Sequence, residues 1–203
     1  MEAIFDKIRR KKKRELAQKN FENNSKLDSD RATTTEGRLV CDQNGTTGDL
    51  FVYGDYPARR NACEAIAVHN ALTLLGKRSC LSEVIVRFQI LRVMVFRGFF
   101  GSNVFRIGRA LKYYGVTYKR FFRKKKTGEP GIYILSYWNE HPLKYGLHTV
   151  AMKYDGKEYS TYNLRGSGVC ADDPKKFAKR FIVGYRAYRE SEAGGKIGEE
   201  END

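Results

Sequence analysis

The sequence predicts an α+β fold in which an N-terminal helical half packs against a C-terminal antiparallel β-sheet. Up to about residue 115, apolar residues recur at helical spacing, whereas after it they alternate or run continuously, as they do in strands. Helical and strand-like segments are therefore segregated along the chain, which is the α+β pattern. A chain of 203 residues, 41% of them hydrophobic, also suits one folded domain with tails.

The N-terminal quarter of the chain is expected to lie outside this domain. Residues 1–29 are highly charged, with a basic run at Arg9–Arg14 and a narrow apolar stripe, which predicts a mobile basic helix. Residues 30–48 are polar and contain Gly and Thr, as expected of a linker. The folded domain is then expected at residues 49–189, followed by an acidic flexible tail at residues 190–203.

Three helices are expected in the helical half. The first begins at Asn61, a favoured N-cap residue that Glu64 follows three positions later, as in a capping box. It ends at Gly76, a residue typical of helix C-termini. Apolar residues cover most of its circumference, so we expect a central helix packed on several sides. The other two helices are expected to begin at Ser82 and at residues 102–103.

The second half is expected to form the sheet, from strands at residues 116–122, 131–138, 148–154, 157–163 and 181–188. Asp155-Gly156 separates the third strand from the fourth, and this dipeptide is typical of a two-residue type I′ loop. With such a loop, His148 lies opposite Asn163 on the same face of the sheet. The amide oxygen of Asn163 could then accept the Nδ1 proton of the ring and leave Nε2 free for chemistry.

Cys63 is expected two residues into the first helix, where it would be a candidate nucleophile. Unpaired N–H groups and the positive end of the helix dipole favour an anion at this position. A histidine cation nearby would lower the pKa of the thiol further, and the thiolate is the nucleophilic form. Cys63, His148 and Asn163 are therefore the predicted chemical group.

These residues occur in an order that resembles the papain-like cysteine peptidase superfamily, above all its compact bacterial branch that processes double-glycine leader peptides. The resemblance covers Asp49–Tyr188 and includes N-A-C-E-A-I-A-V-H-N-A-L, G-S-N-V-F-R-I-G-R-A-L-K-Y-Y-G-V, G-L-H-T-V-A-M-K-Y-D-G-K-E-Y-S-T-Y-N and D-P-K-K-F. It implies a papain-like fold, a nucleophilic Cys63, a general acid/base His148 and an orienting Asn163, where many relatives have Asp. It further implies peptide or protein substrates and no cofactor.

One departure concerns the groups that would hold the oxyanion. The family usually has a glutamine about six residues before the cysteine, and Pro57 stands there in this chain. The backbone N–H of Cys63 remains as a donor, and the side-chain amide of Asn61 is the candidate for a second if its oxygen caps the helix. Gln43 is another amide before the helix, but no pattern locates it.

Three functions stay open from the sequence. The leading one is a papain-like thiol hydrolase, or an acyl transferase, acting on peptide amides. The second is a catalytically inactive scaffold used for binding, favoured by the missing glutamine and by Asn in place of Asp. The third is an adaptor for nucleic acid or acidic partners through the basic runs Arg9–Arg14 and Lys119–Lys126, given the net charge of +14. No nucleic-acid fold signature accompanies these runs, so nucleic acid is not the expected partner.

The remaining cysteines and histidines are expected to have no chemical role. The cysteines show no C-x-x-C spacing and no clustered histidines, so no metal site is expected, and unpaired thiols indicate a reducing cytoplasm. The sequence also has neither a secretory signal nor an apolar stretch of membrane-spanning length. His69 is expected to be structural, and His141 to be exposed in a loop. The cysteines that are expected to have no chemical role are Cys41, Cys80 and Cys170.

Overall fold

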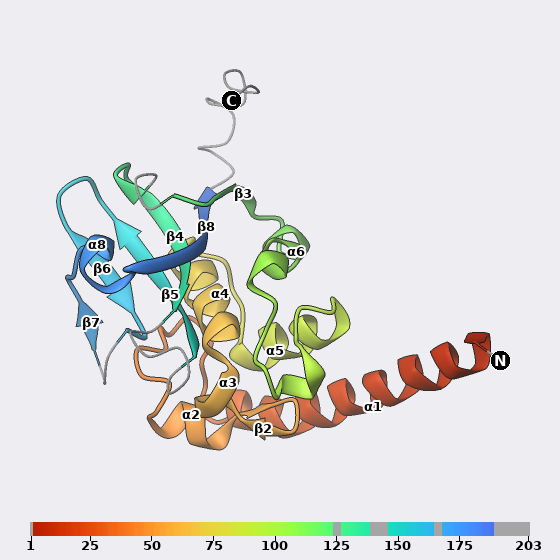
Figure 1. Cartoon of the computed structure of the whole chain (residues 1–203). Coiled ribbons are helices and arrows are strands. Elements are labelled where there is room, and N and C mark those ends of the chain that lie inside the picture. Colours follow the sequence, from red (N-terminus) through yellow and green to blue (C-terminus); the bar gives the residue numbers. More distant parts are fainter. Residues whose placement is uncertain (1, 124–126, 139–145, 165–167, 189–203) are drawn as a thin grey trace.

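The computed structural model describes residues 2–123, 127–138, 146–164 and 168–188, and it places most helices on one side of an antiparallel sheet (Figure 1). The predicted α+β class is confirmed. The six strands of the sheet follow the order β3-β8-β4-β5-β6-β7. They are β3 (Thr117–Phe121), β4 (Gly131–Trp138), β5 (Leu147–Tyr154), β6 (Tyr159–Tyr162), β7 (Val169–Cys170) and β8 (Arg180–Tyr188).

The helices occupy mainly the first half of the chain, as the sequence predicts. They are α1 (Glu2–Ser29), α2 (Thr46–Leu50), α3 (Ala58–Asn61), α4 (Cys63–Leu74), α5 (Leu81–Ile90), α6 (Ile107–Tyr113) and α8 (Pro174–Phe177). Two single turns, η1 (Phe96–Gly98) and η2 (Val104–Arg106), lie between α5 and α6, and β1 (Val52–Tyr53) pairs with β2 (Tyr56–Pro57) in a separate hairpin.

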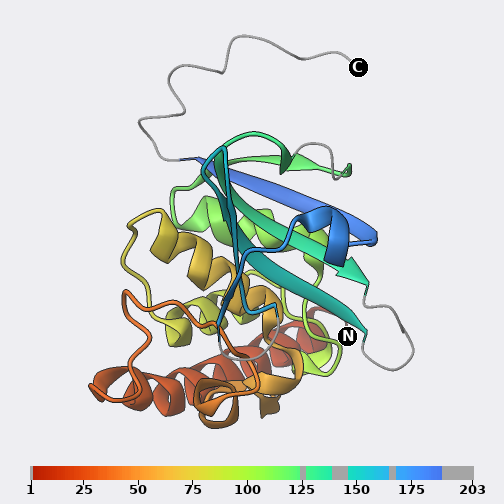
Figure 2. The same cartoon turned by 90° about the vertical axis from the view of Figure 1, so that its left-hand side faces the viewer.

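Helix α4 lies at the centre of the molecule, between the sheet and the other helices (Figure 2). Every residue from 63 to 72 is buried, because small and apolar side chains cover most of the circumference of the helix. Its Ile66 and Leu72 belong to one core cluster with Ile85 of α5 and Ile134 of β4. The predicted central helix, packed on several sides, is confirmed.

Residues 2–29 form the single helix α1, and its second half is part of the folded body rather than a mobile extension. Asn20 donates a hydrogen bond to the carbonyl of Gly54 (2.8 Å). Asn24 accepts from the N–H of Val52 (2.8 Å) and donates to the carbonyl of the same residue (2.9 Å). These side chains give the β1–β2 hairpin partners that it cannot find in its own two-residue strands.

Residues 30–48 are also not a linker. His69 Nε2 bonds to the carbonyl of Arg38 (2.9 Å), which agrees with the structural role predicted for this histidine. Asn70 accepts from the N–H of Val40 (2.8 Å) and donates to the carbonyl of Val40 (2.9 Å). The composition of the segment suggested a linker, but α4 carries buried polar side chains that need partners, and this segment supplies them.

The outer face of the sheet carries a second, smaller apolar cluster under α8. Along β4, Ile134 faces α4, whereas Tyr133, Leu135 and Tyr137 belong to the outer cluster. The ring of Tyr137 lies 5.4 Å from that of Phe177 in α8. Since Tyr137 pairs with His148 across β4 and β5, this face also receives the predicted histidine.

The β5–β6 hairpin differs from the predicted one by two residues in register. Tyr154 pairs with Tyr159, so the loop has four residues instead of two. The side chain of Asp155 accepts hydrogen bonds from the N–H groups of Lys157 and Glu158 (both 2.8 Å), which stabilises the longer turn. A shift by an even number leaves every side chain on its expected face.

Some expectations fall on residues that the structure does not describe. His141, the tail at residues 190–203 and residues 124–126 of the second basic run lie outside the described ranges. Among the helices within those ranges, none combines the length and the apolar composition that a membrane crossing requires.

Replacing Asn70 with Ala should weaken the fold, because it leaves the N–H and the carbonyl of Val40 buried without partners. We expect the free energy of unfolding to fall by roughly 2–4 kcal/mol, from two lost buried hydrogen bonds. Chemical denaturation measures this loss, and amide exchange should accelerate at Val40. Asn23→Ala, at an exposed position of α1, is the matched control. Equal stability of the two variants would contradict the stabilising role of the bonds between Asn70 and Val40.

Candidate functional site

Cys63 is the first residue of α4 and is 6% exposed. Its thiol lies within hydrogen-bonding reach of two backbone N–H groups, those of Glu64 in the same turn and of Thr149 in β5. Thr149 follows His148 directly. The packing of α4 against β5 therefore brings Cys63 to Thr149, whereas the side chain of His148 lies on the opposite face of the strand with Tyr137.

The pKa of the Cys63 thiol is raised well above its ordinary value. Burial is the main cause, because it removes water from the thiolate, and the negative charge of Glu64 adds to it. The two backbone N–H groups act in the opposite direction but do not compensate. The prediction of a lowered pKa is therefore wrong, and the thiol is neutral at rest.

Glu64 follows Cys63 directly and is a buried carboxylic acid whose Oε2 has no hydrogen-bond partner; from the sequence it is expected only to cap the helix. Burial raises its pKa to about 7, although the Cys63 thiol and the hydroxyl and N–H of Ser102 lie close enough to stabilise its anion. The hydroxyl of Ser102 in turn hydrogen-bonds that of Tyr53. A glutamate directly after the cysteine, in the apolar first half of the helix, is the sequence signal for this role.

His148 is held by the backbone of Asn163. Its Nε2 lies 2.7 Å from the carbonyl oxygen of Asn163, and because a carbonyl only accepts, Nε2 carries the proton. Burial lowers the pKa of His148, so the ring is neutral near pH 7 and Nδ1 is its basic nitrogen. The ring also meets that of Tyr137 edge-on, with centroids 5.9 Å apart. The predicted nitrogen assignment, with Nδ1 held and Nε2 free, is reversed.

The side chain of Asn163 binds Gln43 instead of the histidine. Its Oδ1 accepts from the N–H of Gln43 (2.8 Å), and its Nδ2 donates to Oε1 of Gln43 (3.2 Å). Asn163 has a φ of +64°, a left-handed conformation that Asn tolerates, and this turns the chain out of the β6 ladder toward His148. The predicted pair is thus brought together, but through the main chain.

Gln43, which the sequence could not locate, connects this pair to the segment before Cys63. Its Nε2 donates to the carbonyls of Arg59 (2.8 Å) and Ala58 (3.2 Å) in α3. All the polar atoms of its amide therefore engage Asn163 or α3. Gln43 acts as a connector between the two halves of the candidate site.

Asn61 is not the oxyanion donor that the sequence suggested. Its Nδ2 donates to the carbonyls of Gly98 (2.7 Å) and Phe99 (2.8 Å), which engages both of its hydrogens. It does not cap the central helix either. The backbone of Ala62 (φ −101°, ψ 12°) separates α3 from α4 and takes the N-cap position without a side-chain bond.

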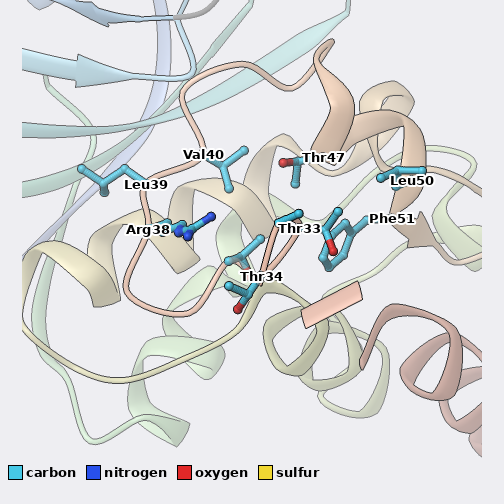
Figure 3. A pocket seen from close by; sticks show the side chains of 10 residues that line it. Thr33, Thr34, Arg38, Leu39, Val40, Thr47, Leu50 and Phe51 are labelled. Carbon is cyan, nitrogen blue, oxygen red and sulfur yellow. The ribbon is translucent and has the colours of Figure 1, made fainter. Parts of the chain in front are cut away.

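Neither the pocket in Figure 3 nor the other cysteines add to this group of residues. The pocket has a volume of about 140 Å³, lies between residues 32–40 and α2, and is lined by Thr33, Arg38 and Thr47 among others but by no predicted site residue. Cys41, Cys80 and Cys170 are free thiols. Over the part of the chain that the structure describes, no cluster of three or more His, Cys, Asp or Glu side chains could hold a metal ion.

Comparisons with known proteins give a structural similarity to set beside this geometry. No family model matches the chain. No curated protein matches it either. Among solved structures, the chain is similar to a double-glycine-motif protease from an AMS/PCAT transporter in complex with the leader peptide. That protease is 20% identical, the match covers 62% of this chain and 84% of the protease chain, and the TM-score is 0.43.

Replacing Glu64 with Gln should make Cys63 more reactive. Above pH 7 the Glu64 carboxylate is ionised and raises the pKa of the thiol, whereas Gln has a similar shape and no charge. The alkylation rate follows the thiolate fraction, so we expect Glu64→Gln to react roughly tenfold faster at pH 8. Iodoacetamide rates at Cys63, followed by mass spectrometry from pH 6 to 10, measure this. Glu158→Gln in the exposed hairpin loop is the control, and identical pH profiles would refute the effect.

Replacing Asn163 with Gly should preserve the environment of His148. Glycine adopts positive φ without cost and retains the carbonyl, while the two bonds from the side chain to Gln43 are lost. We expect NMR titration to show a pKa of His148 still below its ordinary value, and the protein to lose roughly 1–3 kcal/mol of stability. A His148 that titrates at its ordinary pKa in this variant would show that the side chain is the orienting group.

Proposed function

We propose that the protein is a papain-like thiol hydrolase that cleaves peptide amide bonds, with Cys63 as nucleophile and His148 as general base and acid. Asn163 is a positioning residue, and it acts through its carbonyl. The observation that carries the proposal is the 2.7 Å bond from His148 Nε2 to this carbonyl. His148 lies in β5, and the N–H of the next residue, Thr149, is within reach of the thiol. The bond to the carbonyl leaves Nδ1 as the basic nitrogen of a ring that lies one residue along β5 from the position that contacts the thiol.

The reaction starts from a neutral pair, because burial raises the pKa of the thiol and lowers that of the imidazole. Sγ of Cys63 attacks the substrate carbonyl carbon as its proton passes to Nδ1 of His148. The imidazolium is stabilised by the Asn163 carbonyl, and the oxyanion by N–H groups at the start of α4, including that of Cys63. His148 then protonates the leaving amine, and water hydrolyses the thioester; an amine in place of water would give acyl transfer.

Glu64 affects the first of these steps. At rest the Glu64 carboxylate raises the pKa of the thiol and so holds the proton on Cys63, and the side chain of His148 lies on the opposite face of β5. Nδ1 needs to be within about 3.2 Å of the proton donor, or one water away, for the transfer to occur. A rearrangement that brings the Cys63 thiol to Nδ1 of His148 is therefore the first event of the proposed cycle.

A second candidate function is a binding scaffold of the same fold that performs no chemistry. The raised pKa of Cys63 and the engagement of both Asn61 amide hydrogens favour it. The two candidates differ in the reactivity of the thiol. A scaffold needs a buried, unreactive Cys63, whereas a hydrolase needs this thiol to react with carbonyl electrophiles.

Incubation with a diverse peptide pool, read by mass spectrometry, tests the hydrolase. We expect cleavage by the wild-type chain, its loss in Cys63→Ala, and a decrease of roughly 100-fold or more in His148→Ala. Cys170→Ala, which removes a thiol in β7, is the matched control and should cleave normally. Cleavage that survives Cys63→Ala would refute the assignment. Absence of both cleavage and labelling by a peptide aldehyde would favour the scaffold.

A further inference from the structure

Four phenylalanines are exposed on the segment between α5 and α6, which we call the aromatic loop (residues 96–105). The exposed fractions are 76% for Phe96, 44% for Phe99, 65% for Phe100 and 50% for Phe105. The rings of Phe96 and Phe99 both lie edge-on to that of Phe100, with centroids 5.5 and 4.7 Å away. Single exposed apolar residues are ordinary, but a contiguous exposed cluster of aromatic rings indicates an interaction surface.

The aromatic loop is held in one conformation by the rest of the fold. Phe96 and Arg97 have φ values of +43° and +53°, which are costly for residues with large side chains. The carbonyl of Arg97 accepts from the N–H of Asp55 (3.0 Å), and its side chain forms an ion pair with the Asp55 carboxylate (2.7 Å). Asn61 holds the carbonyls of Gly98 and Phe99. The exposed rings are therefore presented by a fixed backbone.

Arginines surround these rings. The guanidinium of Arg60 lies over the ring of Tyr56 (4.8 Å) and near that of Phe99 (5.6 Å). Three further exposed arginines flank the loop, Arg92, Arg106 and Arg109, and the last two bond to carbonyls at the end of α5. The carboxylate of Asp55 is already paired with Arg97. This face therefore presents unbalanced positive charge around apolar rings.

The basic part of α1 extends along the same side of the molecule. The loop rests on the β1–β2 hairpin at Asp55, and the neighbouring Gly54 bonds to Asn20 of α1. Upstream of this contact, α1 continues past the loop (Figures 1 and 2). Its Lys11, Lys12 and Arg14 are exposed, and Lys11 also lies 4.0 Å from the carboxylate of Glu15. Cations of α1 thus add to those around the aromatic loop.

We propose that the aromatic loop and the adjoining basic part of α1 bind the surface of an anionic lipid bilayer. The Phe rings enter the interface between headgroups and acyl chains, and the Arg and Lys side chains contact the lipid phosphates and carboxylates. A bilayer accepts rings and cations together without a shaped partner surface, and the net charge of +14 complements its charge. This binding does not depend on the chemistry of Cys63.

Co-sedimentation of the full chain with vesicles tests the proposal. We expect binding to vesicles of mixed phosphatidylcholine and phosphatidylserine, much weaker binding to phosphatidylcholine alone, and a loss of roughly tenfold or more in Phe96→Ala/Phe100→Ala. The matched control is Phe122→Ala. Phe122 is also an exposed ring next to an arginine, Arg120, but it lies directly after β3 and outside the aromatic loop. Equal vesicle binding by the double variant and the wild type would overturn the proposal.

A fluorescent probe gives a second, direct readout. The chain has one tryptophan, Trp138, so Phe100→Trp in a Trp138→Phe background reports on the loop alone. Its emission should move to shorter wavelengths with anionic vesicles, while Phe122→Trp in the same background should not change. If the double alanine variant keeps its vesicle binding but loses affinity for a cleaved peptide, the loop is a peptide contact and the lipid assignment is wrong.

Discussion

A helix that is buried on every side requires partners inside the protein for its polar groups, and α4 imposes this requirement here, although Oε2 of its Glu64 is left without one. Asn70 meets it by bonding both backbone groups of Val40. That contact fixes the chain just before Gln43, which bonds Asn163 on one side and α3 on the other. Asn163 then offers its carbonyl to His148. The orientation of the histidine thus depends on a polar side chain two turns along the helix from Cys63.

The same burial decides the state of the thiol. A helix N-terminus stabilises an anion by a limited amount, within its first turn. Enclosure of the sulfur and the adjacent Glu64 act against it and are stronger, so the proton stays on Cys63. A position at the start of a helix therefore does not by itself activate a cysteine. Its exposure and its neighbouring charges have to be known as well.

The sequence could predict what depends on local periodicity. The five strands from β3 to β6 and β8, and the burial of α4, follow from apolar spacing. The predicted domain boundary at residue 49 is not where the folded body begins. A polar segment such as 30–48 has the same composition whether its backbone groups bond to water or, as here, to the buried side chain of Asn70. The hairpin register failed because the Asp155 side chain selects a longer turn. Asn163 contacts His148 through its backbone carbonyl. Every residue has this group, so the identity of the Asn163 side chain could not predict the contact.

The strand order has a consequence for how the chain is made. β8 lies between β3 and β4 and pairs with both, although it follows them by more than forty residues in the sequence. During synthesis β3 and β4 therefore leave the ribosome with edges whose native partner has not yet been translated. Such edges can pair with other chains, and pairings between distant segments form slowly. Completion of the sheet must wait for translation of this last strand, and a chaperone that shields the two edges until then would increase the yield of native protein.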